Sequence, residues 1–132
     1  MKQFETDMTK ILNRKKKMAE HIISDSAIEE KKILIDLMLK FGVDIQLVIA
    51  IEEMSELTKE LTKLMRMIRF EKPDTDYTDI KLRIVEEIAD TEICIMNLKL
   101  LMEANEINHL NFCKNQKFDK IQKLVNGDEI DP

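Results

Sequence analysis

Two pairs of acidic residues stand among apolar neighbours in this sequence. The runs are Glu52-Glu53-Met54-Ser55-Glu56, which contains an ExxE pair, and Glu86-Glu87-Ile88-Ala89-Asp90, which contains an ExxD pair. Residues three apart lie on one side of a helix, so each pair can direct two carboxylates toward a common point. Four carboxylates in apolar surroundings repel one another unless a cation compensates their charge. The pattern predicts a metal site formed by Glu53, Glu56, Glu87 and Asp90.

Carboxylate oxygens without an accompanying His or Cys cluster favour Mg²⁺, with Mn²⁺ as a substitute, over zinc. Beside a cleft, such a cation suits phosphate chemistry, because it neutralises phosphate oxygens and lowers the pKa of an attacking water. An isolated ExxE pair is more often a solvated helix face than a pair of ligands. The prediction therefore depends on whether the fold brings the two pairs together.

Helices must carry most of these 132 residues, because only two Gly and two Pro are available for turns. The length fits one domain, residues 1–132, with a core that needs no disulfide. Apolar residues at helical spacing predict helices over about residues 6–23, 26–41, 44–69, 78–103 and 109–125. The predicted fold class is all-α: a helical bundle of four to five helices, with a central antiparallel hairpin carrying the acidic motifs.

Local signals set the expected helix ends. Ser26 followed by Glu29 has the form of a capping box, and Gly42 is expected to end the same helix. The polar segment 71–76 contains Pro73 and predicts a connection between helices. A further break is expected over residues 105–108. The third helix carries one broad apolar stripe, made of Leu47, Ala50, Ile51, Met54, Leu57, Leu61, Leu64, Met65 and Ile68.

Connection lengths support a meeting of the acidic pairs. The third helix continues for about 14 residues, or roughly 21 Å, beyond Glu56, and the fourth returns over about 9 residues, or roughly 14 Å, to Glu87. The difference is about one helical turn, which the connection can absorb. The fourth helix is apolar almost all round, which is typical of a central helix or a subunit contact.

Several function classes are excluded by composition. Gly42 and Gly127 alone cannot form a Walker loop or a dinucleotide fingerprint. The net charge of −5 disfavours nucleic-acid binding, and the basic run 14–17 is interpreted as a solvated helix face. No apolar run has the length of a membrane span, and the N-terminus lacks a signal peptide, so a cytoplasmic protein is expected. Cys94 and Cys113 are interpreted as reduced core residues.

Taken together, these motifs resemble those of the MazG-like all-α nucleoside triphosphate pyrophosphatases, whose signature is EExxE on one helix and ExxD on the next. The context is also similar, with Phe41-Gly42-Val43 and Gln46 before the first motif. On the last helix, the stretch Asn115-Gln116-Lys117-Phe118 resembles an Asn-x-Lys-Phe stretch of the family. The resemblance covers about residues 33–125 and leaves residues 1–32 as an extra N-terminal helix.

The resemblance implies Mg²⁺-dependent cleavage of a nucleoside triphosphate between its α- and β-phosphates, which releases a monophosphate and pyrophosphate. Its metal ligands would be the same four carboxylates. Glu52 would support the site from its edge, where it helps to orient or deprotonate the water, so the predicted catalytic residues are Glu52, Glu53 and Glu56. Family members form dimers or tetramers with pockets between chains, so a homodimer or homotetramer is expected.

Contacts to the nucleotide are also predicted. Asn97 lies seven residues after Asp90, on nearly the same helix face, and is either a pocket contact or a hydrogen-bonded residue at a subunit seam. Lys59, one turn after Glu56, and Lys117 or Lys114 on the last helix would neutralise phosphates. Gln46 completes the predicted substrate contacts. Thirty residues separate Glu56 from Glu87, slightly more than in compact members, which affects the expected pocket shape.

Two other interpretations remain open. A di-metal carboxylate bundle would need two ExxH motifs, and only Glu106 with His109 has that spacing, at an expected helix break. From another class, the chain could be a non-catalytic helical scaffold or regulatory protein whose acidic pairs are merely solvated. A scaffold would show no thermal shift with metal.

Overall fold

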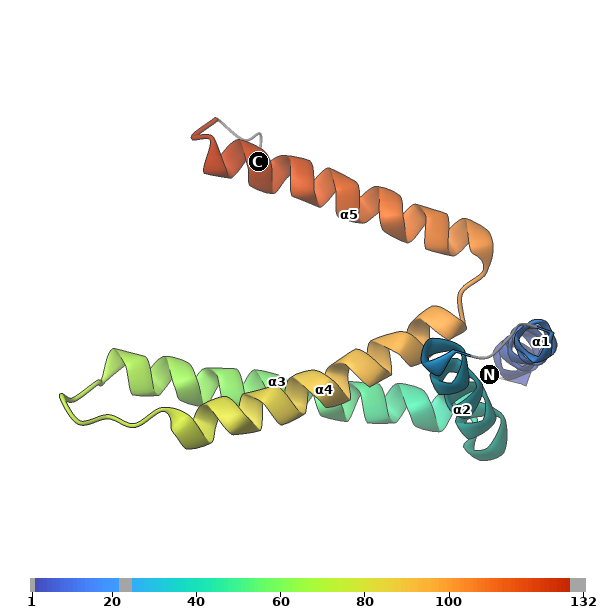
Figure 1. Ribbon diagram of the computed structural model, residues 1–132, viewed down its shortest axis with the longest axis horizontal. Helices are drawn as coiled ribbons and strands as arrows, with labels where there is room; N and C mark the ends of the chain where they lie inside the picture. The colour runs from blue at the N-terminus through green and yellow to red at the C-terminus, as the bar shows by residue number, and fades with distance from the viewer. Residues whose placement is uncertain (1, 22–24, 129–132) are drawn as a thin grey trace. The chain divides into compact units, whose positions relative to one another are not determined.

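The computed structural model describes residues 2–21 and 25–128, and over these residues it contains helices and no strand (Figure 1). The helices are α1 (Lys2–Glu20), α2 (Ser26–Phe41), α3 (Val43–Arg69), α4 (Thr78–Leu100) and α5 (Ala104–Val125). The predicted all-α class is confirmed. The chain divides into two compact units, Met1–Leu101 with α1 to α4 and Met102–Pro132 with α5.

The third and fourth helices form a long antiparallel hairpin, in which they lie side by side over much of their length (Figure 1). The connection predicted at segment 71–76 joins them. Thr75 Oγ1 accepts a hydrogen bond from the Lys72 amide at 2.9 Å, and Asp76 Oδ1 accepts one from the Thr78 amide at 2.9 Å. These bonds close the turn and satisfy an amide at the start of α4, so the polar residues fix where the chain reverses.

The first two helices differ at their ends from the sequence expectation. α1 begins at Lys2 rather than near Thr6, because Phe4, four residues before Met8, continues the apolar period by one more turn. The expected end at Ile23 lies outside the described residues. α2 is capped by Asp25, whose Oδ1 accepts from the Ile28 amide at 2.9 Å. The predicted Ser26 and Glu29 capping box is therefore wrong by one residue.

Gly42 is the joint between α2 and α3. Its amide donates to the Met38 carbonyl at 3.0 Å, and its φ of +99° lies in the region that favours glycine. A Cβ at this position would lie 2.8 Å from Asp44 Oδ1. The joint therefore needs glycine, and the predicted end of α2 at this residue is confirmed.

The boundary between α4 and α5 lies earlier than predicted. The break covers residues 101–103, whereas residues 105–108, expected to be irregular, form the first turns of α5. The physical reason is a cap. The Glu103 amide donates to Glu106 Oε1 at 3.1 Å, which satisfies an amide at the helix start.

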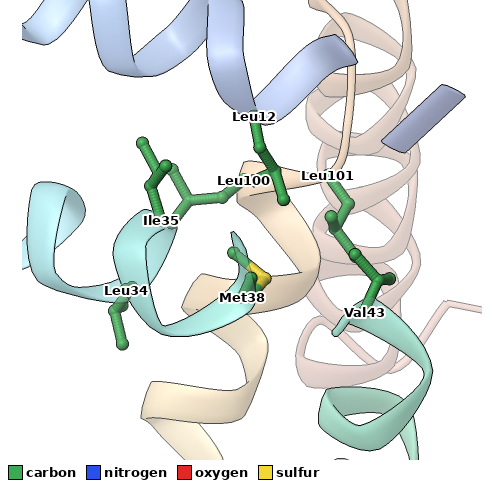
Figure 2. Packing of buried hydrophobic residues seen from close by; sticks show 7 residues of the cluster. All are labelled: Leu12, Leu34, Ile35, Met38, Val43, Leu100 and Leu101. Atoms are coloured by element: carbon green, nitrogen blue, oxygen red, sulfur yellow. The ribbon is translucent and has the colours of Figure 1, made fainter. Parts of the chain in front are cut away.

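The largest buried cluster lies where α1 and α2 meet the open end of the hairpin (Figure 2). It contains Leu12 from α1, three residues of α2, the first residue of α3 and two residues at the C-terminal end of α4: Leu12, Leu34, Ile35, Met38, Val43, Leu100 and Leu101. Lys15 of α1 adds a hydrogen bond of 2.7 Å from its Nζ to the Leu100 carbonyl, at the C-terminal end of α4. The N-terminal helix thus belongs to the core that fixes the hairpin's open end.

Along the hairpin, the less exposed residues recur with alternating spacings of three and four, as in a coiled coil. We call these positions the seam. On α3 they are Val43, Gln46, Ala50, Glu53, Leu57, Glu60, Leu64 and Met67, and on α4 they are Ile80, Ile84, Glu87, Thr91, Cys94 and Leu98. Acidic residues therefore occupy three positions that face the partner helix.

The apolar stripe predicted on α3 divides between two faces. Ala50, Leu57 and Leu64 lie in the seam, whereas the other members that protrude from the hairpin are largely exposed: Ile51, Met54, Leu61, Met65 and Ile68. None of the helices among the described residues is long and apolar enough to cross a membrane.

Candidate metal centre

Three of the four predicted ligands converge between α3 and α4. Glu53, Glu87 and Asp90 each offer a carboxylate oxygen, and these three oxygens all lie within 4.8 Å of one another. Glu53 and Glu87 are half-buried seam residues, whereas Asp90 lies one turn after Glu87 and is exposed. The cluster is therefore anchored inside the hairpin and open to solvent on one side.

Burial and mutual repulsion raise the pKa of two carboxyl groups in this cluster. Burial raises the pKa of Glu53 above its ordinary value, and the charges of Asp90, Glu52 and Glu56 raise it further. Burial also raises the pKa of Glu87, with the charge of Glu53 as the next contribution. The site therefore disfavours its own negative charge, which is the condition that a bound cation relieves.

One carboxylate oxygen of Glu87 gives further support for a cation site. Its Oε2 is buried and has no hydrogen-bond partner among the described residues. The same holds for the hydroxyl oxygen of Thr91, the next seam residue on α4. Buried oxygens are nearly always satisfied by a donor, water or ion, so these two fit a set of hard oxygen ligands. Thr91 was not predicted, because a threonine in a helix carries no metal signature by itself.

Glu60, another glutamate of the seam, has basic partners that compensate its charge. Glu60 is only 6% exposed, and its Oε1 lies 3.0 Å from Lys63 Nζ while its Oε2 lies 3.2 Å from Arg83 Nε. These two hydrogen-bonded cations lower the pKa of Glu60 despite its burial. Among the described ion pairs, none joins a basic residue to Glu53 or Glu87. Glu60 therefore belongs to an ion pair, whereas Glu53 and Glu87 belong to a candidate cation site.

Two predicted catalytic residues do not converge with the three carboxylates. Glu56 is exposed and falls outside the group of converging oxygens, and its Oε2 is 3.9 Å from Lys59 Nζ. Its charge still contributes to the raised pKa of both Glu53 and Glu87. Glu52 is exposed as well and lines a different part of the surface. Both carboxylates remain accessible from solvent.

The hollow that Glu52 lines has a volume of about 600 Å³. Its other walls come from α1 and the start of α3, including Phe4, Ile45 and Val48. By the helical period, these α3 residues lie on the side turned away from the seam. The hollow is therefore separated from the three converging carboxylates by the body of α3.

The predicted nucleotide contacts lie in three different settings. Asn97 is 5% exposed, and its Oδ1 is buried without a hydrogen-bond partner among the described residues. Gln46 is a buried seam residue on α3, close to the end of the hairpin at which α3 begins. Lys59 is exposed and beside Glu56. Lys117 and Lys114 lie on α5, in the second unit.

The ExxH motif of the rival di-metal interpretation lies on α5. Glu106 accepts from the Glu103 amide, and the His109 imidazole lies 3.6 Å from the Cys113 thiol and stacks on Phe112. These residues belong to the second unit, and the helix break expected here is absent.

Cys94 is buried in the seam, where burial and the nearby Glu53 raise the pKa of its thiol.

The donor set is made of carboxylates, which matches the preferences of Mg²⁺ and Mn²⁺. Comparison with known proteins adds no relative: no protein-family model matches the chain, and neither a curated protein nor a solved structure gives a match.

Proposed function

We propose that the protein is a Mg²⁺-dependent nucleoside triphosphate pyrophosphohydrolase. The observation that carries the proposal is the convergence of Glu53, Glu87 and Asp90 within 4.8 Å, with Glu87 Oε2 buried and unpartnered among the described residues. Convergence supports cation binding. The choice of reaction rests on the resemblance of the EExxE and ExxD motifs to those of the MazG-like pyrophosphatases.

Each acidic residue has a role that its position supports. Glu53, Glu87 and Asp90 hold the cation, and Glu56, one turn from Glu53, supplies a further carboxylate from the solvent side. A bound Mg²⁺ neutralises phosphate oxygens and lowers the pKa of water. Glu56, on the solvent side of the cluster, orients a water molecule and accepts its proton, because Glu52 lies on the side of α3 turned away from the seam. The water oxygen attacks phosphorus, the bond between the α-phosphate and the bridging oxygen breaks, and pyrophosphate leaves with that oxygen.

Recognition of the nucleotide uses groups near the same hairpin. The Oδ1 of Asn97 is an acceptor without a donor among the described residues, which suits an N–H group of a base. Lys59 lies one turn beyond Glu56 and can attract phosphate charge. On this proposal the buried amide contributes to base selection and the exposed lysine to binding of the triphosphate.

A second copy of the chain is part of the proposal. The exposed apolar face of α3, which includes Ile51, Leu61 and Met65, continues onto Val85 and Ile88 of α4. By the helical period, both parts lie on the side of the hairpin opposite Asp90 and Glu56. Pairing these faces would bury a large apolar area without covering the carboxylates.

An assay for pyrophosphate, as distinct from orthophosphate, tests the reaction. The protein is incubated with Mg²⁺ and a panel of standard and modified nucleoside triphosphates. We expect at least one nucleotide to yield pyrophosphate, and Glu53→Gln or Asp90→Asn to lower the rate by about 100-fold or more. Glu86→Gln, at an exposed neighbouring position, is the matched control and should retain the rate. A panel that yields no pyrophosphate would refute the proposal.

A further inference from the structure

The ion pair between Glu60 and Arg83 links the two helices that carry the acidic motifs. Glu60 is a buried seam residue of α3, and Arg83 lies on α4 one turn before Glu87. Neither residue belongs to the cluster of converging carboxylates. Only the Glu60 carboxylate is removed from water, because the Arg83 side chain is 51% exposed and reaches it from the edge of the seam. Desolvation of the carboxylate offsets much of the attraction, so stability alone does not account for a charged residue at this seam position.

Its spacing matches that of the metal centre. Glu60 follows Glu53 by seven residues, and Arg83 precedes Asp90 by seven residues. Seven residues are two helical turns, or about 10 Å along the axis. In an antiparallel hairpin, a step of two turns along one helix matches the same step backward along the other. The alignment that places Glu60 against Arg83 is thus the alignment that places Glu53 against Asp90.

Slipped alignments of the same hairpin would be penalised at Glu60. If α4 shifts along α3, the two seams still face each other only when the shift is about three, four or seven residues. In place of Arg83, Glu60 would then face one apolar residue or one of five acidic ones: Asp76, Asp79, Ile80, Glu86, Glu87 or Asp90. Lys63, on the same helix, stays beside Glu60 in every alignment, but a second carboxylate would then share this one cation at a buried position, which is unfavourable. Arg83 therefore gives Glu60 one favourable alignment.

We propose that the Glu60–Arg83 ion pair sets the register of α3 against α4 and thereby assembles the metal centre. Both are positioning residues: they act through the placement of Glu53, Glu87 and Asp90. The part of this inference that concerns cation binding rests on the proposed function. The part that concerns helix register stands on the ion pair and the seam alone.

The decisive variant replaces both charges by apolar side chains, Glu60→Leu with Arg83→Leu. Glu60→Leu removes a buried charge from the seam, and Arg83→Leu changes a side chain that is half exposed, so the hairpin should remain folded. Its register should become ambiguous, because leucine accepts any seam partner. We expect unchanged or higher resistance to urea together with Mg²⁺ affinity at least about tenfold weaker. Lys16→Leu with Asp36→Leu, which removes an exposed ion pair of 2.7 Å between α1 and α2, is the matched control.

Register is measured directly with nitroxide labels at Thr62 and Glu92, two exposed positions on α3 and α4. The labels are attached to cysteines at those positions, in a background in which Cys94→Ala and Cys113→Ser remove the native thiols. Excess unlabelled chain ensures that pulsed electron paramagnetic resonance reports distances within one chain. We expect one narrow distance in the parent and a second population, displaced by about 5 or 10 Å, in the double-leucine variant.

A reversed pair, Glu60→Lys with Arg83→Glu, provides a second test. The lysine introduced on α3 is attracted to the carboxylate introduced on α4 in the native alignment, and also to the acidic residues of the slipped alignments. We therefore expect several distances despite the restored ion pair. If the ion pair only stabilised the fold, the reversed pair should restore the single distance of the parent. One narrow distance in both variants, identical to that of the parent, would overturn the proposal, whether or not the parent binds Mg²⁺. If the parent binds no cation, the distances still decide the register.

Discussion

Glu60 and Glu87 are both glutamates in the seam between α3 and α4, and their pKa values shift in opposite directions. Hydrogen bonds from Lys63 and Arg83 lower the pKa of Glu60, whereas burial and neighbouring carboxylates raise the pKa of Glu87. The two residues are of the same type and lie between the same two helices, so the opposite pKa shifts come from their different partners. A seam carboxylate without a basic partner is the residue from which a cation site can be built.

The raised pKa of Glu87 predicts how stability depends on pH when no metal is present. Because the folded protein binds this proton more tightly than the unfolded chain, the contribution is fully present below the ordinary pKa of 4.5 and is lost as pH rises through the raised value. Glu87→Gln imitates the protonated side chain and removes the effect. Urea unfolding in EDTA should therefore show the parent losing stability, relative to Glu87→Gln, as pH rises above about 4.5.

Saturating Mg²⁺ should reduce or reverse this trend in the parent, because cation binding favours the ionised carboxylates. The variant Glu86→Gln, at an exposed position beside Glu87, should follow the parent at every pH. A stability difference between the parent and Glu87→Gln that stays constant from acid to neutral pH would contradict the assignment of the shift to this residue.

At the scale of the helices, the hairpin combines a buried seam with a second, exposed apolar face. Ile80 of α4 is 1% exposed, whereas Leu82 on the same helix is 59% exposed. The seam residues lie between α3 and α4, whereas Leu82 faces solvent. The same helices therefore hold the carboxylate cluster between them and leave a second apolar surface exposed.

Ile80→Ala and Leu82→Ala form a matched pair that measures this difference. Ile80→Ala should lower the free energy of unfolding by about 2–5 kcal/mol, since it removes a fully buried side chain. Leu82→Ala should change it by less than about 0.5 kcal/mol. Urea denaturation of the two variants gives both values, and equal losses would mean that the seam is assigned to the wrong face.

The sequence was sufficient to predict the helices and the hairpin but not which face of α3 packs against α4. Apolar periodicity and Gly42 identified α3, yet the apolar residues on it are numerous enough to fill two faces. Side-chain type favoured Ile51 and Leu61 as core, whereas packing places Glu53 and Glu60 in the seam instead. The role of Glu60 depends on Arg83, 23 residues away, and such a pairing becomes visible only when the two helices are aligned.

At the scale of the molecule, the first unit places its core and the carboxylate cluster at different points along the hairpin. The largest core cluster gathers α1 and α2 at the open end, around Leu12 and Ile35. Beyond it, α3 and α4 extend with one acidic side and one apolar side. An extended hairpin with an exposed apolar face is the arrangement that a second copy would complete into a four-helix bundle.

Leu61→Glu with Met65→Glu tests this assembly by placing two charges on the exposed apolar face. We expect the parent to be a dimer or tetramer by light scattering after size-exclusion chromatography, and the double variant to shift to a smaller species. Ile33→Glu changes an exposed apolar residue of α2 and serves as the control. A monomeric parent would rule out self-association through this face.

Cation binding by Glu53, Glu87 and Asp90 is the central claim, and calorimetric titration with Mg²⁺ and Mn²⁺ tests it most directly. The parent should bind saturably, with proton release that increases as pH falls toward the raised pKa values of both glutamates. Glu87→Gln should weaken binding by about tenfold or more, whereas Glu86→Gln should leave it unchanged. A parent that binds neither cation, or a Glu87→Gln variant that binds as tightly as the parent, would contradict the claim.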